Sequence, residues 1–151
     1  MTDIAAKRKP RGGNFANGVL NSYFLKENNI PMTIATMSEW DNVEFYIKEF
    51  KLAKWFDVDK IVYSNGKIPG KPAPDIFLIA AGKIGLNPKD CVVFEDAIAG
   101  INAAKAAGIG KIIAVDSIEP IEFYRDIDGL SGIITSFDEV DKSMFEIPSV
   151  I

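Results

Sequence analysis

The sequence contains no histidine at all and a single cysteine, Cys91. Without histidine, hydrolysis through Ser-His-Asp or Cys-His groups, phosphohistidine chemistry and histidine-ligated metal sites are all excluded. One cysteine cannot form an intramolecular disulfide, which fits a reducing, cytoplasmic environment. Any chemistry must use carboxylates, lysine, hydroxyl groups and backbone amides. Phosphoryl transfer through Mg²⁺ is one of the few common reaction classes that this set of groups permits.

Long hydrophobic runs and an excess of positive charge are missing too. The apolar stretches are too short to span a bilayer, and no signal-peptide pattern is found. Seventeen Lys and Arg residues against 21 Asp and Glu give a net charge of −4, which argues against a nucleic-acid surface. We therefore expect neither a nucleic-acid nor a membrane partner. At 151 residues, 48% hydrophobic and 25% charged, the chain is typical of one globular domain.

Apolar strands that alternate with helical patterns predict an α/β fold with a parallel sheet and flanking helices. Residues 1–15, with a basic cluster, a proline and a Gly-Gly pair, are expected to form a tail or loop, and residues 16–151 the core domain. The expected helices are 19–28, one that begins after Ser38, 75–84, 97–107 and a short one near 137. The expected strands are 30–36, 60–63, 91–94, 111–115 and 132–135.

Two of these helices have predicted caps. Ser38 follows the first strand and has Asp41 three residues later, an imperfect capping box. Asp75 is expected to cap the helix that follows Pro74.

Ligands of parallel sheets collect beyond the carboxyl ends of the strands. Thr36, Glu95 and Asp96 all fall at such ends, and we expect them to share a site.

Lys71 lies in the segment GKPAPDIF. Pro72 and Pro74 fix their own φ angles and bias the residues before them to extended geometry, so this loop is stiff. A stiff loop that presents one ammonium group is suited to hold a phosphate. Taken alone, a Gly-Lys-Pro sequence more often marks an exposed lysine in a turn.

Glu95 and Asp96 are adjacent carboxylates at the end of an apolar run, and the small residues from Ala97 allow a helix to start at once. The two charges repel, and a divalent cation such as Mg²⁺ relieves that repulsion. Thr36 offers a hydroxyl beside the amides of Met37 and Ser38, which together would make a cradle for phosphate oxygens. Taken alone, the carboxylates would be solvated loop residues and the threonine a helix cap.

The string KPAPDIF, followed by VFEDAIAGI, resembles the haloacid dehalogenase (HAD) superfamily, most closely its β-phosphoglucomutase-like phosphatase branch. The resemblance covers Val19 to Val140. It implies a Rossmann-like core and Mg²⁺-dependent hydrolysis of a small phosphorylated metabolite, sugar phosphates included, with a sugar-phosphate mutase as a narrower variant.

The same resemblance assigns roles to individual residues. It implies that Lys71 and Thr36 bind the phosphoryl group with the Met37 amide. It also implies that Asp96 binds Mg²⁺ directly while Glu95 holds a water ligand of the ion.

Two parts of the family pattern are missing: the nucleophilic aspartate in D-x-D-G-T/V and the helical cap that selects the substrate. Residues 126–130 (DIDGL) imitate the nucleophile motif, but no buried strand precedes them, and we do not expect them to be catalytic. We therefore expect a truncated or nucleophile-less form with little activity alone. The alternative is a non-catalytic remnant or interaction domain that binds Mg²⁺ or phosphate weakly.

The resembled family also places its first strand centrally, between the strands that here end at Thr36 and Glu95. Without it, both neighbours have unpaired backbone groups. Either these two strands pair directly, or the N-terminal tail or another chain fills the gap, which includes self-association through the unpaired edges.

Overall fold

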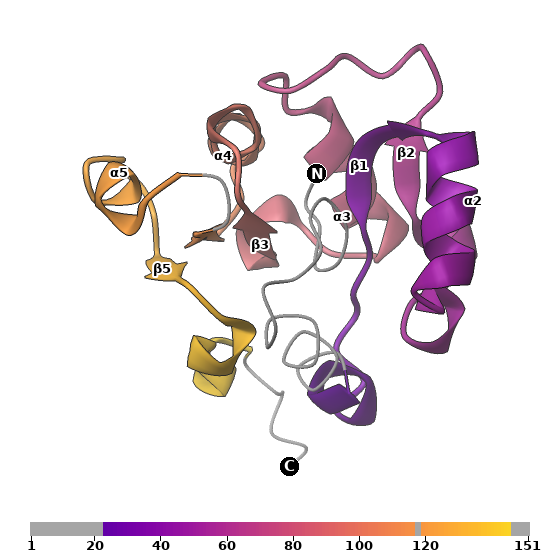
Figure 1. Ribbon diagram of the computed structural model, residues 1–151, viewed down its shortest axis with the longest axis horizontal. Coiled ribbons are helices and arrows are strands. Elements are labelled where there is room, and N and C mark those ends of the chain that lie inside the picture. The colour runs from indigo at the N-terminus through magenta and orange to yellow at the C-terminus, as the bar shows by residue number, and fades with distance from the viewer. Residues whose placement is uncertain (1–22, 117–118, 146–151) are drawn as a thin grey trace.

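The computed structural model describes residues 23–116 and 119–145, and strands and helices alternate along them (Figure 1). After a helical segment at residues 23–27, the strands are β1 (Ala35–Glu39), β2 (Val62–Ser64), β3 (Val92–Glu95), β4 (Lys111–Val115) and β5 (Gly132–Ile134). The helices are α2 (Trp40–Glu49), α3 (Asp75–Lys83), α4 (Ile98–Ala106) and α5 (Ile121–Arg125). Short 3₁₀ turns connect several of these elements: Leu52–Lys54, Val58–Lys60, Pro88–Asp90, Phe137–Glu139 and Lys142–Met144.

All strand pairs in the described residues are parallel, as expected for an α/β chain, but they form two sheets. β1 pairs with β2, and β3, β4 and β5 form a second sheet in that order. Direct pairing of the strands that carry Thr36 and Glu95, one of the expected outcomes, is therefore wrong. The other outcomes remain predictions, because residues 1–22 lie outside the described part.

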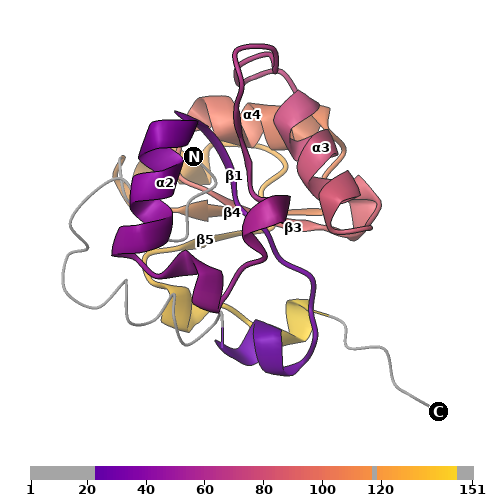
Figure 2. The same ribbon diagram turned by 90° about the vertical axis from the view of Figure 1, so that its right-hand side faces the viewer.

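Neighbouring residues at the start of β1 and β2 contribute to separate parts of the core, because successive side chains of an extended chain point to opposite sides. Ala35 and Val62 join a large buried cluster that also contains residues of α3, α4, β3 and β4, whereas Ile34 and Ile61 join a second cluster with Val43 of α2. α3 packs on β1 and β2, and α4 on β3 and β4. Figure 2 shows α3 and α4 together on one side of the strands. The large cluster thus connects the two sheets through these helices.

Several sequence expectations agree with the structure. Residues 111–115 form β4 as expected, and residues 23–27 fall inside the predicted helix 19–28, whose first four residues lie outside the described part. Cys91 is buried. None of the helices in residues 23–116 and 119–145 is long and apolar enough to cross a membrane.

The predicted caps are wrong at two helices. β1 continues to Glu39, so Glu39 rather than Ser38 precedes the first turn of α2, and its side chain makes no capping hydrogen bond. Pro74 precedes α3, and Asp75 is the first helical residue. An acidic residue there still favours the helix, because the amino end of a helix carries a partial positive charge.

α5 was not expected, because residues 122–125 read as a loop before the DIDGL segment. It has only five residues and follows Pro120, so the sequence offers too few turns to show a helical period. DIDGL itself lies between α5 and β5 and follows no strand, as expected.

Candidate functional site

The site predicted from the sequence is built around one ion pair. Lys71 Nζ lies 2.6 Å from Glu95 Oε2, and the exposed fractions of the two side chains are 7% and 0%. Lys71 comes from the proline-rich loop after β2, and Glu95 ends β3. Lys71 Nζ also lies 5.0 Å from the centre of the Phe77 ring in α3. The pair therefore connects the loop that follows one sheet to the carboxyl end of the other.

The second carboxylate oxygen of Glu95 is held by the backbone that follows it. The amides of Asp96 and Ala97 both donate to Glu95 Oε1 at 3.1 Å. Three donors thus converge on a fully buried carboxylate, which is how proteins tolerate a charge out of water.

Gly100 in α4 leaves the space in which the Glu95 side chain lies. A Cβ atom at Gly100 would overlap the Glu95 carboxyl group, whereas at Gly82 in α3 it would meet nothing within 4 Å. Gly100, one of the small residues after Asp96, thus allows α4 to lie close to the Glu95 carboxyl group.

Burial and the Lys71 ammonium group shift the pKa of the Glu95 carboxyl in opposite directions. Loss of water raises its pKa and is the largest influence, while the Lys71 ammonium lowers it. The net direction is a raised pKa, because a carboxylate at 0% exposure has lost nearly all of its solvation. Lys71 therefore contributes most to the stability of the folded protein at neutral pH, where its ammonium group compensates the charge of the ionised Glu95 carboxylate.

Asp96 is half-buried, and its main chain is anchored from a distant part of the sequence. The Tyr124 hydroxyl of α5 donates to the Asp96 carbonyl oxygen at 2.7 Å, across 28 residues. Tyr124 is fully buried. Sequence reasoning missed this residue because the helix that carries it was itself not recognised.

Thr36 and Met37 lie on β1, in the other sheet. Thr36 is buried, and its hydroxyl accepts a hydrogen bond from the Ser38 amide at 3.1 Å. One amide of the predicted phosphate cradle is therefore bound to Thr36 itself. The Met37 side chain packs against the cluster that contains Phe77 and Val93. The structure thus pairs Lys71 with Glu95, the residue directly before Asp96, while Thr36 and Met37 lie on β1.

The described residues contain no group of three or more His, Cys, Asp and Glu side chains that could hold a metal ion. Glu95 and Asp96 still fit Mg²⁺ in their chemistry, because this ion prefers oxygen ligands, uses one or two carboxylates in many sites and keeps several waters. Asp96, half-buried just after β3 and with its main chain bonded to Tyr124, offers one such carboxylate, whereas both oxygens of Glu95 already accept hydrogen bonds from Lys71 and the backbone.

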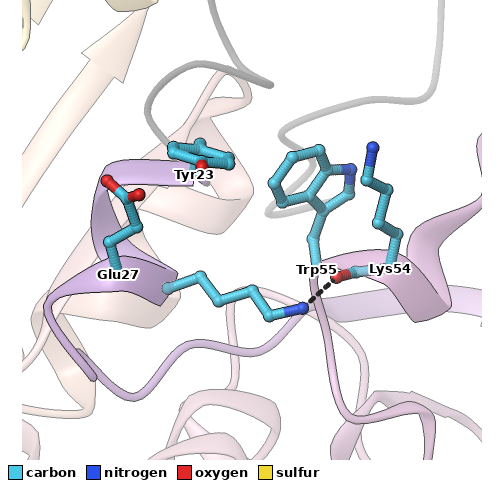
Figure 3. Close-up of a pocket in the computed structure, with 5 residues that line it drawn as sticks. Tyr23, Glu27, Lys54 and Trp55 are labelled. Carbon is cyan, nitrogen blue, oxygen red and sulfur yellow. Dashed lines mark hydrogen bonds between the residues drawn. The ribbon is translucent and has the colours of Figure 1, made fainter.

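A pocket of about 250 Å³ lies elsewhere, between residues 23–27 and the turn after α2 (Figure 3). Its lining residues are Tyr23, Lys26, Glu27, Lys54 and Trp55. The Tyr23 and Trp55 rings meet edge to face, Lys26 Nζ donates to the Lys54 carbonyl at 2.6 Å, and Lys54 Nζ lies over the Trp55 ring. These contacts dock the first described helix on the domain, and none of them involves a predicted site residue.

Comparisons with known proteins agree with this fold and this pair of motifs. The family model of haloacid dehalogenase-like hydrolases matches residues 17–108. A probable pseudouridine-5'-phosphatase of Drosophila melanogaster is 41% identical over 129 residues, which are 83% of this chain and 54% of that protein. The chain belongs to the haloacid dehalogenase-like hydrolase family.

Solved structures of proteins from the same family resemble this chain in fold. A haloacid dehalogenase hydrolase of family IA, variant 3, from Entamoeba histolytica superposes with a TM-score of 0.81 at 40% identity, over 84% of this chain and 57% of that one. A β-phosphoglucomutase from Clostridium difficile gives a TM-score of 0.65 at 25% identity, over 81% and 50% of the two chains. The chain thus spans about half the length of these relatives.

Proposed function

We propose that this chain carries the phosphate- and Mg²⁺-binding half of a HAD-type phosphohydrolase that acts on a small phosphorylated metabolite. The observation that carries the proposal is the buried Lys71–Glu95 pair, which lies directly beside Asp96 at the end of β3. A phosphate ester needs a fixed cation and, with it, carboxylates that hold a divalent ion. Family membership and a relative described as a probable pseudouridine-5'-phosphatase support this class of substrate.

In this proposal Lys71 binds the phosphoryl group without leaving Glu95. An ammonium group has three N–H donors, and the contact with Glu95 Oε2 uses one of them. The remaining donors stabilise negative charge on phosphoryl oxygens, together with the Thr36 hydroxyl and the Met37 amide. Asp96 would hold Mg²⁺ directly and Glu95 a water ligand of the ion, and the bound ion would neutralise phosphate charge.

The attack on phosphorus requires a further carboxylate, since this half-site contains no nucleophilic aspartate in the family's motif context. We propose that the chain alone therefore turns over only slowly. Sugar phosphates fall within the proposed substrate class, and a mutase that moves the phosphoryl group within a sugar is the narrower variant, in line with the similarity to a β-phosphoglucomutase.

The test is hydrolysis of p-nitrophenyl phosphate with Mg²⁺ by the wild type, Asp96→Ala and Asp128→Ala. Turnover that Asp96→Ala abolishes and Asp128→Ala leaves intact supports a phosphohydrolase with its metal ligand at Asp96. Turnover that Asp128→Ala abolishes would instead assign the chemistry to the DIDGL segment and contradict the proposal.

A second candidate is a binding domain without turnover. It is favoured by the separation of β1 from β3, because a site that needs both sheets is then held only through side chains and helices. A folded chain that binds Mg²⁺ and phosphate but hydrolyses nothing would select this candidate.

A further inference from the structure

We propose that Tyr124 is a positioning residue for the metal-binding carboxylate Asp96, and that α5 is thereby part of the functional half-site. The inference rests on the proposed function, since it concerns how this chain holds Asp96 for Mg²⁺. Nothing in the motif segments points to Tyr124, which lies 28 residues beyond Asp96.

The hydrogen bond from Tyr124 reaches Asp96, the one of the two adjacent acidic residues that lies outside β3. Glu95 is the last residue of β3 and is paired in register with Ala114 of β4. Asp96 lies after the strand and before α4, whose first residue is Ile98. The peptide between Asp96 and Ala97 is held at both of its polar atoms: its N–H donates to Glu95 Oε1 at 3.1 Å, and its carbonyl oxygen accepts from the Tyr124 hydroxyl at 2.7 Å. Tyr124 thus supplies the second of two hydrogen bonds that set ψ of Asp96 and the direction of the chain that follows.

The Tyr124 ring is itself fully buried, which favours a lasting hydrogen bond from its hydroxyl. Tyr124 has an exposed fraction of 0% and belongs to the cluster that includes Ala103, Ala104 and Ala114. Ala103 and Ala104 lie in α4 and Ala114 in β4, and their small side chains share this cluster with the Tyr124 ring. The small residues of α4 thus leave room for an aromatic ring from a third element.

The Tyr124 hydroxyl donates to the Asp96 carbonyl oxygen without adding a charge beside the cation site. A phenylalanine would fill the same space and remove the hydroxyl together with its hydrogen bonds.

The experiment measures Mn²⁺ binding, as a spectroscopic stand-in for Mg²⁺, by the loss of the free-ion signal in electron paramagnetic resonance. The wild type is compared with Tyr124→Phe, with Asp96→Asn and with Tyr46→Phe, a matched control on α2, which packs on β1 and β2. Inorganic phosphate binding without metal is measured on the same variants by calorimetry. We expect Tyr124→Phe to weaken Mn²⁺ binding about five- to tenfold, Tyr46→Phe to leave it unchanged, and phosphate binding to be unchanged in both.

Equal Mn²⁺ affinity of Tyr124→Phe and the wild type would overturn the inference and leave the proposed function intact. A wild type that binds no Mn²⁺ would overturn the proposed metal site and this inference with it. Loss of phosphate and Mn²⁺ binding together in Tyr124→Phe would indicate a general structural role and also overturn it.

A second measurement needs no variant. In a chain labelled with ¹³C at the tyrosine Cζ atoms, Mg²⁺ should shift the Tyr124 signal and not that of Tyr46. A Tyr124 signal that Mg²⁺ leaves unchanged would contradict the inference.

Discussion

Lys71 Nζ and Glu95 Oε2 lie 2.6 Å apart and are both almost completely removed from solvent. The two residues are 24 positions apart in sequence and come from different sheets or their loops. Within the described part of the chain, this contact connects the two motif segments that identify the family.

Lys71→Met should destabilise the protein strongly at neutral pH. The methionine keeps the apolar stem but leaves the Glu95 carboxylate buried without its cation, and breaking a buried pair in this way typically costs about 3–5 kcal/mol. Urea unfolding measures the change. Lys67→Met, an exposed lysine in the same loop, is the matched control and should change the free energy of unfolding by less than about 0.5 kcal/mol.

The penalty of Lys71→Met should also depend on pH. Without the ammonium group, the pKa of the Glu95 carboxyl in the folded state rises further, because Lys71 is what lowers it. A carboxyl whose folded pKa exceeds its unfolded value loses stability as pH rises through the folded pKa. Lys71→Met should therefore be less harmful at pH 5 than at pH 8, and adding Glu95→Gln should recover part of the loss at pH 8. A penalty that is equal at both pH values would contradict a buried, charged Glu95.

Gly100→Ala should displace the Glu95 side chain, because the new Cβ would overlap its carboxyl group. We expect a loss of about 1–3 kcal/mol in the free energy of unfolding, as for other overpacked sites. Gly82→Ala is the matched control, a helical glycine with open space around it. It should be neutral or stabilise by up to about 1 kcal/mol, since alanine is the better helix former. Equal effects of the two substitutions would show that Glu95 does not depend on the space at Gly100.

Cys91 should react slowly with a thiol reagent in the folded protein. Its Sγ atom is buried against the Asn87 carbonyl, and burial raises its pKa, so less of it is the reactive thiolate at a given pH. The rate of reaction with 5,5′-dithiobis(2-nitrobenzoic acid) should therefore still rise with pH above the ordinary thiol value of about 8.5. In denaturant the same thiol should react at the rate of a small-molecule thiol. A plateau below the ordinary thiol value in the folded protein would rule out a buried Cys91.

Sequence patterns predicted the elements whose signal lies in a few consecutive residues. β4 is a run of apolar residues after a glycine and agrees with its expected range, and Glu95-Asp96 falls at the end of a strand as expected. β1 differs because the chain stays extended past Thr36 to Glu39, which no propensity of Met37 or Ser38 indicates. A cap was therefore assigned to a residue inside the strand.

The site was predicted as a set of residues and not as a set of contacts. Lys71 and Glu95 were assigned to phosphate and to a metal ligand, while the structure shows them paired with each other. Such pairing depends on how the proline-rich loop folds over α3 and β3, which is tertiary information. Tyr124 shows the same limit, since its hydroxyl acts on Asp96 from a helix too short to be read from the sequence.

The most direct test of a combined phosphate and Mg²⁺ half-site is a calorimetric titration of inorganic phosphate into the chain with and without Mg²⁺. If both ligands share the site around Lys71, Glu95 and Asp96, Mg²⁺ must strengthen phosphate binding, and phosphate must strengthen Mg²⁺ binding by the same factor. We expect a gain of about fivefold or more, the lower end of typical coupling between sites. Asp96→Asn should abolish this gain and leave the metal-free phosphate affinity unchanged. Phosphate affinity that Mg²⁺ does not alter, or a gain that persists in Asp96→Asn, would contradict the half-site.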